Sequence, residues 1–135
     1  YGFDNKTGRL ISDLLNAFLQ HELFILNDPI PRRDYLYIKD FIDLIIAITD
    51  NTKVYEGIFN VGFGESYSNL EVVNLFNNLT GNALEIALNN QIRTNDIQNC
   101  VIDNSKVCAA YSWEPHYTLN DGISEMIHEI QINIS

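Results

Sequence analysis

Hydrophobic positions in the first third of the chain predict one helix and two short strands. From Leu10 to about His21, apolar residues recur three and four positions apart, which is the spacing of an amphipathic helix. Leu23 to Leu26 is a short β-like run that ends in the turn Asn27-Asp28-Pro29. Arg33 to Ile38 alternates in the manner of a strand and leads to Asp40, a residue type that caps helices.

The middle of the chain predicts two more helices with a strand between them. Residues 41–49 are almost wholly apolar, so we expect a helix that is buried on most sides. Ile58 to Val61 predicts a strand, followed by Gly62-Phe63-Gly64. Ser68-Asn69-Leu70-Glu71 is a capping box, and the apolar stripe after it predicts a helix that stops at Gly81.

The last third predicts a short strand and two helices. Leu84 to Leu88 is strand-like, and residues 89–99 form a polar loop. After an extended Val101-Ile102, Asp103 or Asn104 caps a short helix that runs through Tyr111. A final helix starts at Thr118 and runs to about Ile132. The sequence therefore predicts a mixed α/β fold with few short strands and about five helices, forming a single domain over residues 1–135.

Composition excludes several classes of function. The 135 residues are 46% hydrophobic and 19% charged, as in ordinary globular chains, but the net charge is −10. This acidic balance argues against nucleic acid or an anionic membrane as a partner, since both attract basic surfaces. No apolar run is long enough to span a bilayer. We expect a cytoplasmic protein with reduced thiols at Cys100 and Cys108, and no metal site.

The start of the chain is unusual. Tyr1-Gly2-Phe3-Asp4 lacks an initiator Met and resembles the end of a structural element that begins earlier. We therefore expect the chain to be a fragment of a longer polypeptide.

A small set of cations is the main candidate for chemistry. Arg32 and Arg33 stand at a strand entrance, and Arg93 lies in a polar loop three residues before Asp96. The planar fork of Arg suits phosphate, and a nearby carboxylate can accept from ribose hydroxyls. The alternative is ordinary surface ion pairing with the many acidic residues. Because side chains alternate along a strand, we expect Arg32 and Arg33 to face opposite sides.

Other motifs favour structural interpretations. Tyr35-x-x-x-Lys39 matches a dehydrogenase acid/base pair, but that pair needs a helix, and this one falls on the predicted strand. Gly62-x-Gly64 lacks the third glycine of a dinucleotide-binding loop, so we expect it to turn the chain toward Ser68. The three histidines lie on different elements with no carboxylate at metal-ligand spacing.

Six short runs, taken in order, carry a resemblance that covers nearly the whole chain. They are Tyr1-Gly2, residues 33–40 (RDYLYIKD), residues 59–64 (FNVGFG) with Ser68 and Glu71, Arg93-x-x-Asp96, Asp103-x-Ser105-Lys106, and Trp113-x-Pro115 with Leu119-x-x-Gly122. Together they resemble the C-terminal, substrate-binding part of the NAD-dependent epimerase/dehydratase family, the extended short-chain dehydrogenases that act on nucleotide sugars.

The resemblance implies roles for five residues. Arg33 and Arg93 would bind the diphosphate of a UDP-, dTDP- or GDP-linked sugar, and Asp96 would bind the ribose. Backbone groups of Phe24 and Leu26 would contact the base, as in nucleotide-sugar epimerases. The turn Asn27-Asp28-Pro29 departs from the family's glycine-rich turn, which leaves the base preference open.

The resemblance also implies what this chain lacks. The family's glycine-rich NAD loop and catalytic Tyr-x-x-x-Lys belong before Tyr1, so we expect this piece alone to bind no NAD and to be catalytically incomplete. The intact parent would use NAD or NADP and form a homodimer. Without the dinucleotide-binding sheet, strand edges and one apolar face would be exposed and favour self-association. The alternative is a stand-alone, non-catalytic binding or interaction module derived from that family.

Overall fold

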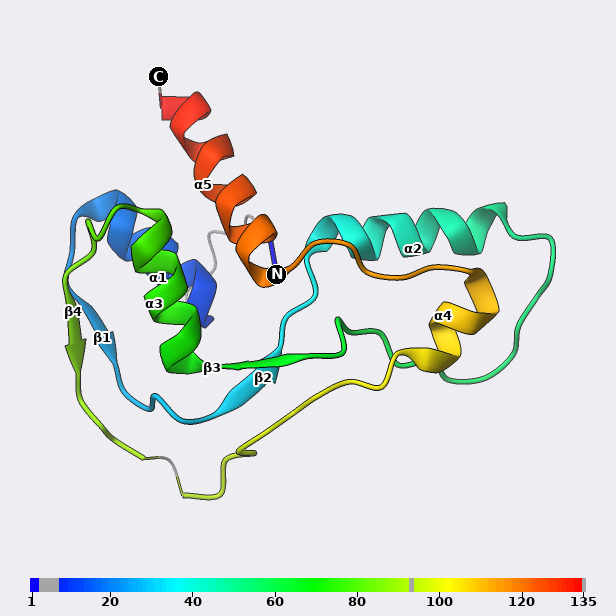
Figure 1. Ribbon diagram of the computed structural model, residues 1–135, viewed down its shortest axis with the longest axis horizontal. Coiled ribbons are helices and arrows are strands. Elements are labelled where there is room, and N and C mark those ends of the chain that lie inside the picture. The colour runs from blue at the N-terminus through cyan, green and yellow to red at the C-terminus, as the bar shows by residue number, and fades with distance from the viewer. Residues whose placement is uncertain (3–7, 93, 135) are drawn as a thin grey trace.

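The elements form two groups joined by a pair of short strands. A computed structural model of the chain describes residues 1–2, 8–92 and 94–134. Helices α1, α3 and α5 and strands β1 and β4 lie on one side of Figure 1, and helices α2 and α4 lie on the other. Strands β2 and β3 run between the two groups.

The larger group is built on three amphipathic helices. They are α1 (Leu10–Gln20), α3 (Asn69–Leu79) and α5 (Leu119–Ile134). Their apolar faces meet in one core, which also includes Tyr37 and strand β1. The most buried members of this core are Leu14, Val72, Val73, Phe76 and Ile123. The helices predicted from residues 10–21 and 118–132 are thus confirmed, because their apolar stripes have each other to pack against.

Four short strands form two separate pairs within the described residues. Strand β1 (Phe24–Leu26) pairs in parallel with β4 (Ile86–Leu88), with Ile25 opposite Ala87. Strand β2 (Arg32–Asp34) pairs antiparallel with β3 (Ser66–Ser68), with Arg33 opposite Tyr67.

The smaller group packs α2 (Ile38–Asp50) against α4 (Ser105–Tyr111). Leu44, Val107 and Trp113 form a second small core. The indole Nε1 of Trp113 donates to the backbone oxygen of Asp40 at 3.1 Å, so the turn after α4 is fixed to the first turn of α2.

The predicted role of Asp40 is wrong. The helix begins at Ile38 with Tyr37 at the N-cap, so Asp40 lies inside the first turn. Its carboxylate is fully buried and accepts from the backbone N–H groups of His116, at 2.8 Å, and Tyr117, at 3.1 Å. A carboxylate with two backbone donors can replace water inside a protein, which explains why the charge is tolerated there.

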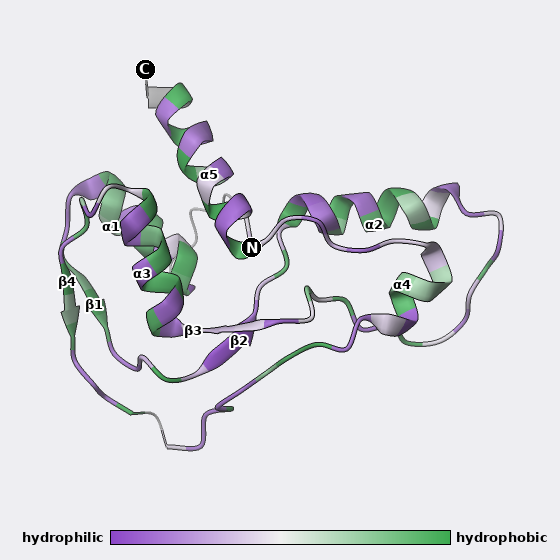
Figure 2. Cartoon of the chain, in the orientation of Figure 1, coloured by the Kyte–Doolittle hydropathy of each residue, from purple (hydrophilic) through white to green (hydrophobic). Residues whose placement is uncertain are grey.

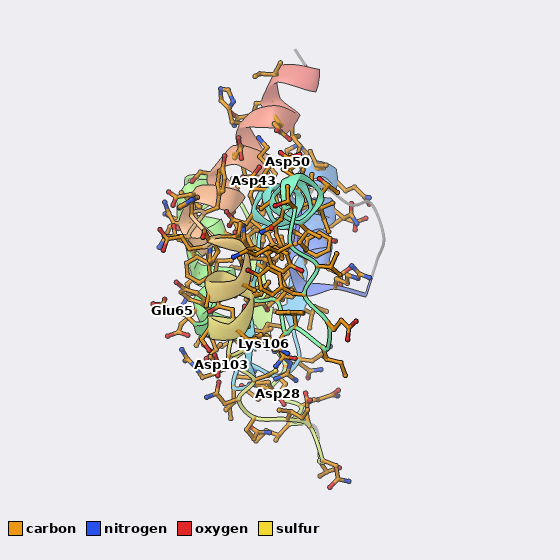
Figure 3. All side chains as sticks on the ribbon, turned by 90° about the vertical axis from the view of Figure 1, so that its right-hand side faces the viewer. Asp28, Asp43, Asp50, Glu65, Asp103 and Lys106 are labelled. Atoms are coloured by element: carbon orange, nitrogen blue, oxygen red, sulfur yellow. The ribbon has the colours of Figure 1, made fainter. Side chains whose placement is uncertain are left out.

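The expectation that α2 is buried on most sides is also wrong. Only Asp40 and Leu44 of this helix are buried. An apolar stripe on its open side is 41–51% exposed; it consists of Ile38, Phe41, Ile42, Ile45 and Ile46. Figure 2 shows the hydrophobic colour over most turns of α2, and Figure 3 labels Asp43 and Asp50, two exposed acidic residues of the same helix. The sequence predicted an apolar helix correctly, but in the described part of the chain α4 and the turn after it pack on the opposite side of α2 and leave this stripe exposed.

Two strand predictions need correction, and one strand was not predicted. The strand predicted over Arg33–Ile38 is only Arg32–Asp34, since helix α2 already begins at Ile38. Ile58 to Val61 forms no strand; Phe59 and Val61 pack on the small core, while Ile58 is 87% exposed. The partner of β2 is β3, which ends at Ser68, the first residue of the capping box, and carried no strand pattern.

The capping box and the glycines are confirmed. Ser68 Oγ accepts from the N–H of Glu71 at 3.1 Å, and the carboxylate of Glu71 accepts from the N–H of Ser68 at 2.6 Å. Gly62 lies so close to Ile102 that a Cβ would stand 2.4 Å from the Ile102 side chain, and Gly64 has a φ of +95°. Both glycines therefore serve the turn that leads to β3.

The predicted fold class is confirmed: the described residues form a mixed α/β structure with five helices and four short strands. None of these helices has the length and apolar character needed to cross a membrane.

Candidate functional site

A cleft of about 320 Å³ opens between strand β1, the start of α1 and strand β2. Its polar lining includes one arginine, Arg33, among several acidic and amide side chains. The lining residues are Gly8, Leu10, Asp13, Phe24, Ile25, Leu26, Asn27, Asp28, Arg33, Tyr35, Asn69 and Asp96. Four of the five residues singled out by the sequence therefore meet in one place, although they come from three distant segments.

Arg33 and Asp96 form the charged centre of the cleft. Arg33 Nη2 donates to Asp96 Oδ1 at 2.7 Å, and Nη1 donates to the backbone oxygens of Ile97, at 2.5 Å, and Arg32, at 2.9 Å. Both side chains are partly exposed, at 33% and 24%. The guanidinium is thus held in place by three oxygens while part of it stays open to the cleft.

Arg32 lies outside the cleft and serves a structural role. Its guanidinium pairs with Glu71 at 2.8 Å and donates to the backbone oxygen of Ser66 at 2.6 Å. The pKa of Glu71 is lowered, first because the N–H of Ser68 donates to it and then because Arg32 lies beside it. Strand alternation thus separates the two arginines as the sequence predicted.

The segment that carries Asp96 lies along β2. The N–H of Arg32 donates to the oxygen of Gln98 at 2.8 Å, and the N–H of Cys100 donates back to the oxygen of Arg32 at 3.1 Å. Two residues further on, the N–H of Ile102 donates to the side chain of Asp34 at 3.1 Å. These bonds fix the register of residues 98–102 against β2, and Asp96 lies two residues before this segment.

Strand β1 forms one wall of the cleft and is bonded to β4 along one edge. The N–H of Phe24 donates to the oxygen of Glu85, and the oxygen of Leu26 accepts from the N–H of Asn89, both at 2.9 Å. Backbone groups alternate in direction along a strand, so those of Ile25 point to the opposite edge. The sequence selected Phe24 and Leu26; the strand pairing adds Ile25, which lay between them without a signal of its own.

Arg93, the second predicted cation, lies outside the described residues. Two other carboxylates of the cleft accept from backbone donors: Asp13 Oδ1 accepts from the N–H of Gly8 at 2.8 Å, and Asp28 Oδ1 accepts from the N–H of Ile30 at 3.2 Å. Burial raises the pKa of the Tyr35 phenol, which therefore stays neutral in the cleft wall.

The pair Tyr35 and Lys39 does not share a helix. Tyr35 precedes α2 and Lys39 lies in the first turn of that helix, so the strand predicted for both is wrong. The two residues still do not form the helical Tyr-x-x-x-Lys pair of a dehydrogenase. Lys39 pairs instead with Glu125 and Glu129 of α5. Both cysteines are free thiols, and within the described part of the chain no three His, Cys, Asp or Glu residues gather to hold a metal.

Comparison with known sequences shows which proteins this chain resembles. The NAD dependent epimerase/dehydratase family matches residues 1–62. The chain is 28% identical over 100 residues to dTDP-4-dehydro-6-deoxyglucose reductase of Escherichia coli, covering 74% of this chain and 31% of that protein. It is 32% identical over 91 residues to UDP-glucose 4-epimerase of Bifidobacterium longum, covering 66% of this chain and 26% of that protein. The resemblance to the NAD-dependent epimerase/dehydratase family is confirmed.

Solved structures agree in fold. A UDP-glucose 4-epimerase with UDP-glucose from Thermotoga maritima superposes with a TM-score of 0.85 at 21% identity, over 100% of this chain and 44% of that one. RMD from Pseudomonas aeruginosa complexed with NADPH superposes with a TM-score of 0.82 at 15% identity, over 98% of this chain and 46% of that one. This chain thus spans less than half the length of these relatives.

Proposed function

We propose that this chain is the nucleotide-sugar-binding portion of an NAD- or NADP-dependent nucleotide-sugar epimerase, dehydratase or reductase. The observation that carries the proposal is Arg33, held by Asp96 and Ile97 at the mouth of a cleft in a chain with a net charge of −10. A cation fixed in a concave site of so acidic a protein is suited to an anion, and the Arg fork to a phosphate.

The cleft offers a place for each part of a nucleoside diphosphate. Nη1 and Nη2 of Arg33 already donate to oxygens of Arg32, Ile97 and Asp96. The diphosphate would therefore approach the Nε edge of the guanidinium. Asp96 would accept from a ribose hydroxyl, and Arg93, as the resemblance implies, would be the second phosphate ligand.

The base would lie against strand β1. Base contacts at Phe24 and Leu26 remain a prediction from the resemblance. Because the backbone groups of both residues pair with β4, we add the backbone of Ile25, which faces the opposite edge of the strand. One N–H and one C=O on the same edge complement the donor and acceptor groups of a base, so main-chain recognition is compatible with UDP, dTDP or GDP.

The complete reaction would need more polypeptide than this chain contains. In the intact parent, hydride would pass between the sugar and NAD or NADP, with the acid/base pair supplied outside residues 1–135. We propose that these residues form a single substrate-binding domain of a cytoplasmic, homodimeric enzyme. The need for further polypeptide is supported by the relatives named as epimerases and reductases, which are two to four times as long as the matched region.

A calorimetric screen tests this function. The protein encoded by the complete gene should bind one of the UDP-, dTDP- or GDP-linked sugars and turn it over with NAD or NADP. A native protein that starts near Tyr1 and binds a nucleotide sugar without turnover would establish the stand-alone binding module instead. Absence of binding to all three classes would refute both.

A further inference from the structure

Asp34 joins two loops to strand β2 through a single carboxylate. Oδ1 accepts from the N–H of Phe63 at 2.7 Å, and Oδ2 accepts from the N–H groups of Gly64, at 2.9 Å, and Ile102, at 3.1 Å. The residue follows Arg33 directly, so the strand presents the cleft cation on one face and this carboxylate on the other.

The bond to Ile102 replaces a main-chain bond. Arg32 pairs through its backbone with Gln98 and Cys100, which is the start of a parallel ladder. The next rung of such a ladder would join the N–H of Ile102 to the backbone oxygen of residue 34. The side chain of Asp34 takes that N–H instead, so the segment stays attached to β2 beyond the point where the ladder ends.

This attachment governs where Asp96 lies. Residues 98–102 are held at one end by the backbone of Arg32 and at the other by Asp34, and the segment continues back to Ile97 and Asp96, both of which bind Arg33. Loosening the Asp34 end would let the segment shift along β2. A shift of one residue would remove Asp96 from Arg33 and change the edge that the guanidinium presents.

We propose that Asp34 is a positioning residue for nucleotide binding: it sets the register of the segment 96–102 against β2 and thereby brings Asp96 to Arg33. The inference rests on the proposed function for its ligand. The structural part of the inference, which is the register of the segment against β2, can be tested without a ligand.

The test compares Asp34→Asn with Asp40→Asn in the full-length protein. Both carboxylates accept backbone N–H groups, but Asp40 bonds to His116 and Tyr117, away from the cleft. The amide of Asp34→Asn can accept on one atom only, so the affinity for the nucleoside diphosphate that binds best, UDP, dTDP or GDP, should fall about tenfold. Asp40→Asn should lose stability and change that affinity less than twofold in the folded protein.

A double-mutant cycle separates positioning from general damage. If Asp34 acts through Asp96, then Asp34→Asn should not weaken binding further in an Asp96→Ala background. An additive loss, an unchanged affinity in the single variant, or an equal loss in Asp40→Asn would each overturn the proposal. If Arg33→Ala also leaves binding unchanged, it is the proposed function that fails.

Hydrogen exchange gives a readout without nucleotide. Asp34→Asn should accelerate exchange of the Cys100 and Ile102 amides at least tenfold, whereas Asp40→Asn should leave them unchanged. Equal exchange rates of these two amides in the two variants would refute the role of Asp34 in setting the register. Should Asp34→Asn fail to fold, Asp34→Glu keeps the charge but displaces the carboxylate, and it should accelerate the same two amides; unchanged exchange there counts against the proposal.

Discussion

The guanidinium of Arg33 and the carboxylate of Asp96 meet at 2.7 Å across 63 positions of sequence. The same guanidinium donates to the backbone oxygen of Ile97, so it is bound to two consecutive residues of one loop. An arginine restrained in this way loses little rotamer freedom when an anion arrives. The ion pair is therefore already arranged for the phosphate contact that we propose.

Arg33→Ala should cost about 2 kcal/mol or more in nucleotide-sugar binding, equivalent to at least about 30-fold in Kd, because a charge-assisted contact is lost. Isothermal calorimetry of the full-length protein measures this loss. Arg32→Ala is the matched control: it removes the neighbouring cation and its bonds to Glu71 and Ser66, and should leave Kd within about threefold. Equal losses in the two variants would contradict the assignment of Arg33.

Gly122→Ala should destabilise the protein although it lies in a helix. Alanine normally favours a helix interior over glycine by about 1 kcal/mol. Here the added Cβ would stand 2.2 Å from the hydroxyl of Tyr1 and 2.9 Å from the ring of Tyr37. Overpacking of this kind costs about 1–3 kcal/mol, so we expect a net loss in the free energy of unfolding, measured by urea denaturation. His128→Ala, at an exposed position of the same helix, should change stability by less than about 0.5 kcal/mol.

The capping box of α3 should make stability depend on pH in the acid range. The folded-state pKa of Glu71 lies below its ordinary 4.5, chiefly because the N–H of Ser68 donates to the carboxylate. A lowered pKa contributes stability that is present above pH 4.5 and is lost as the pH falls through the folded-state value. Urea denaturation between pH 7 and pH 3 should show this loss in the wild type and a smaller one in Glu71→Gln.

Two companion variants complete the capping test. Ser68→Ala removes the hydroxyl that accepts from Glu71 and should cost about 1 kcal/mol at pH 7. Glu56→Gln alters an exposed carboxylate outside this network and should retain the wild-type acid dependence. An unchanged pH profile in Glu71→Gln would show that other carboxylates dominate the acid transition.

The apolar stripe of α2 should make the isolated 135-residue chain associate and bind hydrophobic dyes, since exposed patches of this kind favour contact with other apolar surfaces. Ile42 and Ile46 are 49% and 51% exposed. Changing both to Asp should lower dye fluorescence by about half and reduce concentration-dependent light scattering. Ile132→Asp places the same charge at a 61% exposed position of α5 and should have little effect. If Ile132→Asp had the same effect as the change of Ile42 and Ile46, the surface responsible for association would lie outside this stripe.

The sequence by itself determined the local elements of this protein. Helical spacing defined α1, α3 and α5, the capping box defined the start of α3, and Gly62 and Gly64 defined a turn, because each depends on neighbours a few residues away. The resemblance selected Arg33 and Asp96, and strand alternation correctly separated Arg33 from Arg32.

Only the tertiary structure decided the contacts between distant segments. Asp40 looked like a helix cap and is instead a buried acceptor for the backbone of His116 and Tyr117. Residues 66–68 became a strand because β2 lay beside them, while Ile58–Val61 had no partner among the described residues and stayed unpaired. A strand forms only when another backbone takes up its hydrogen bonds, and a helix face is buried only when something covers it. Neither condition can be read from the sequence of the segment itself.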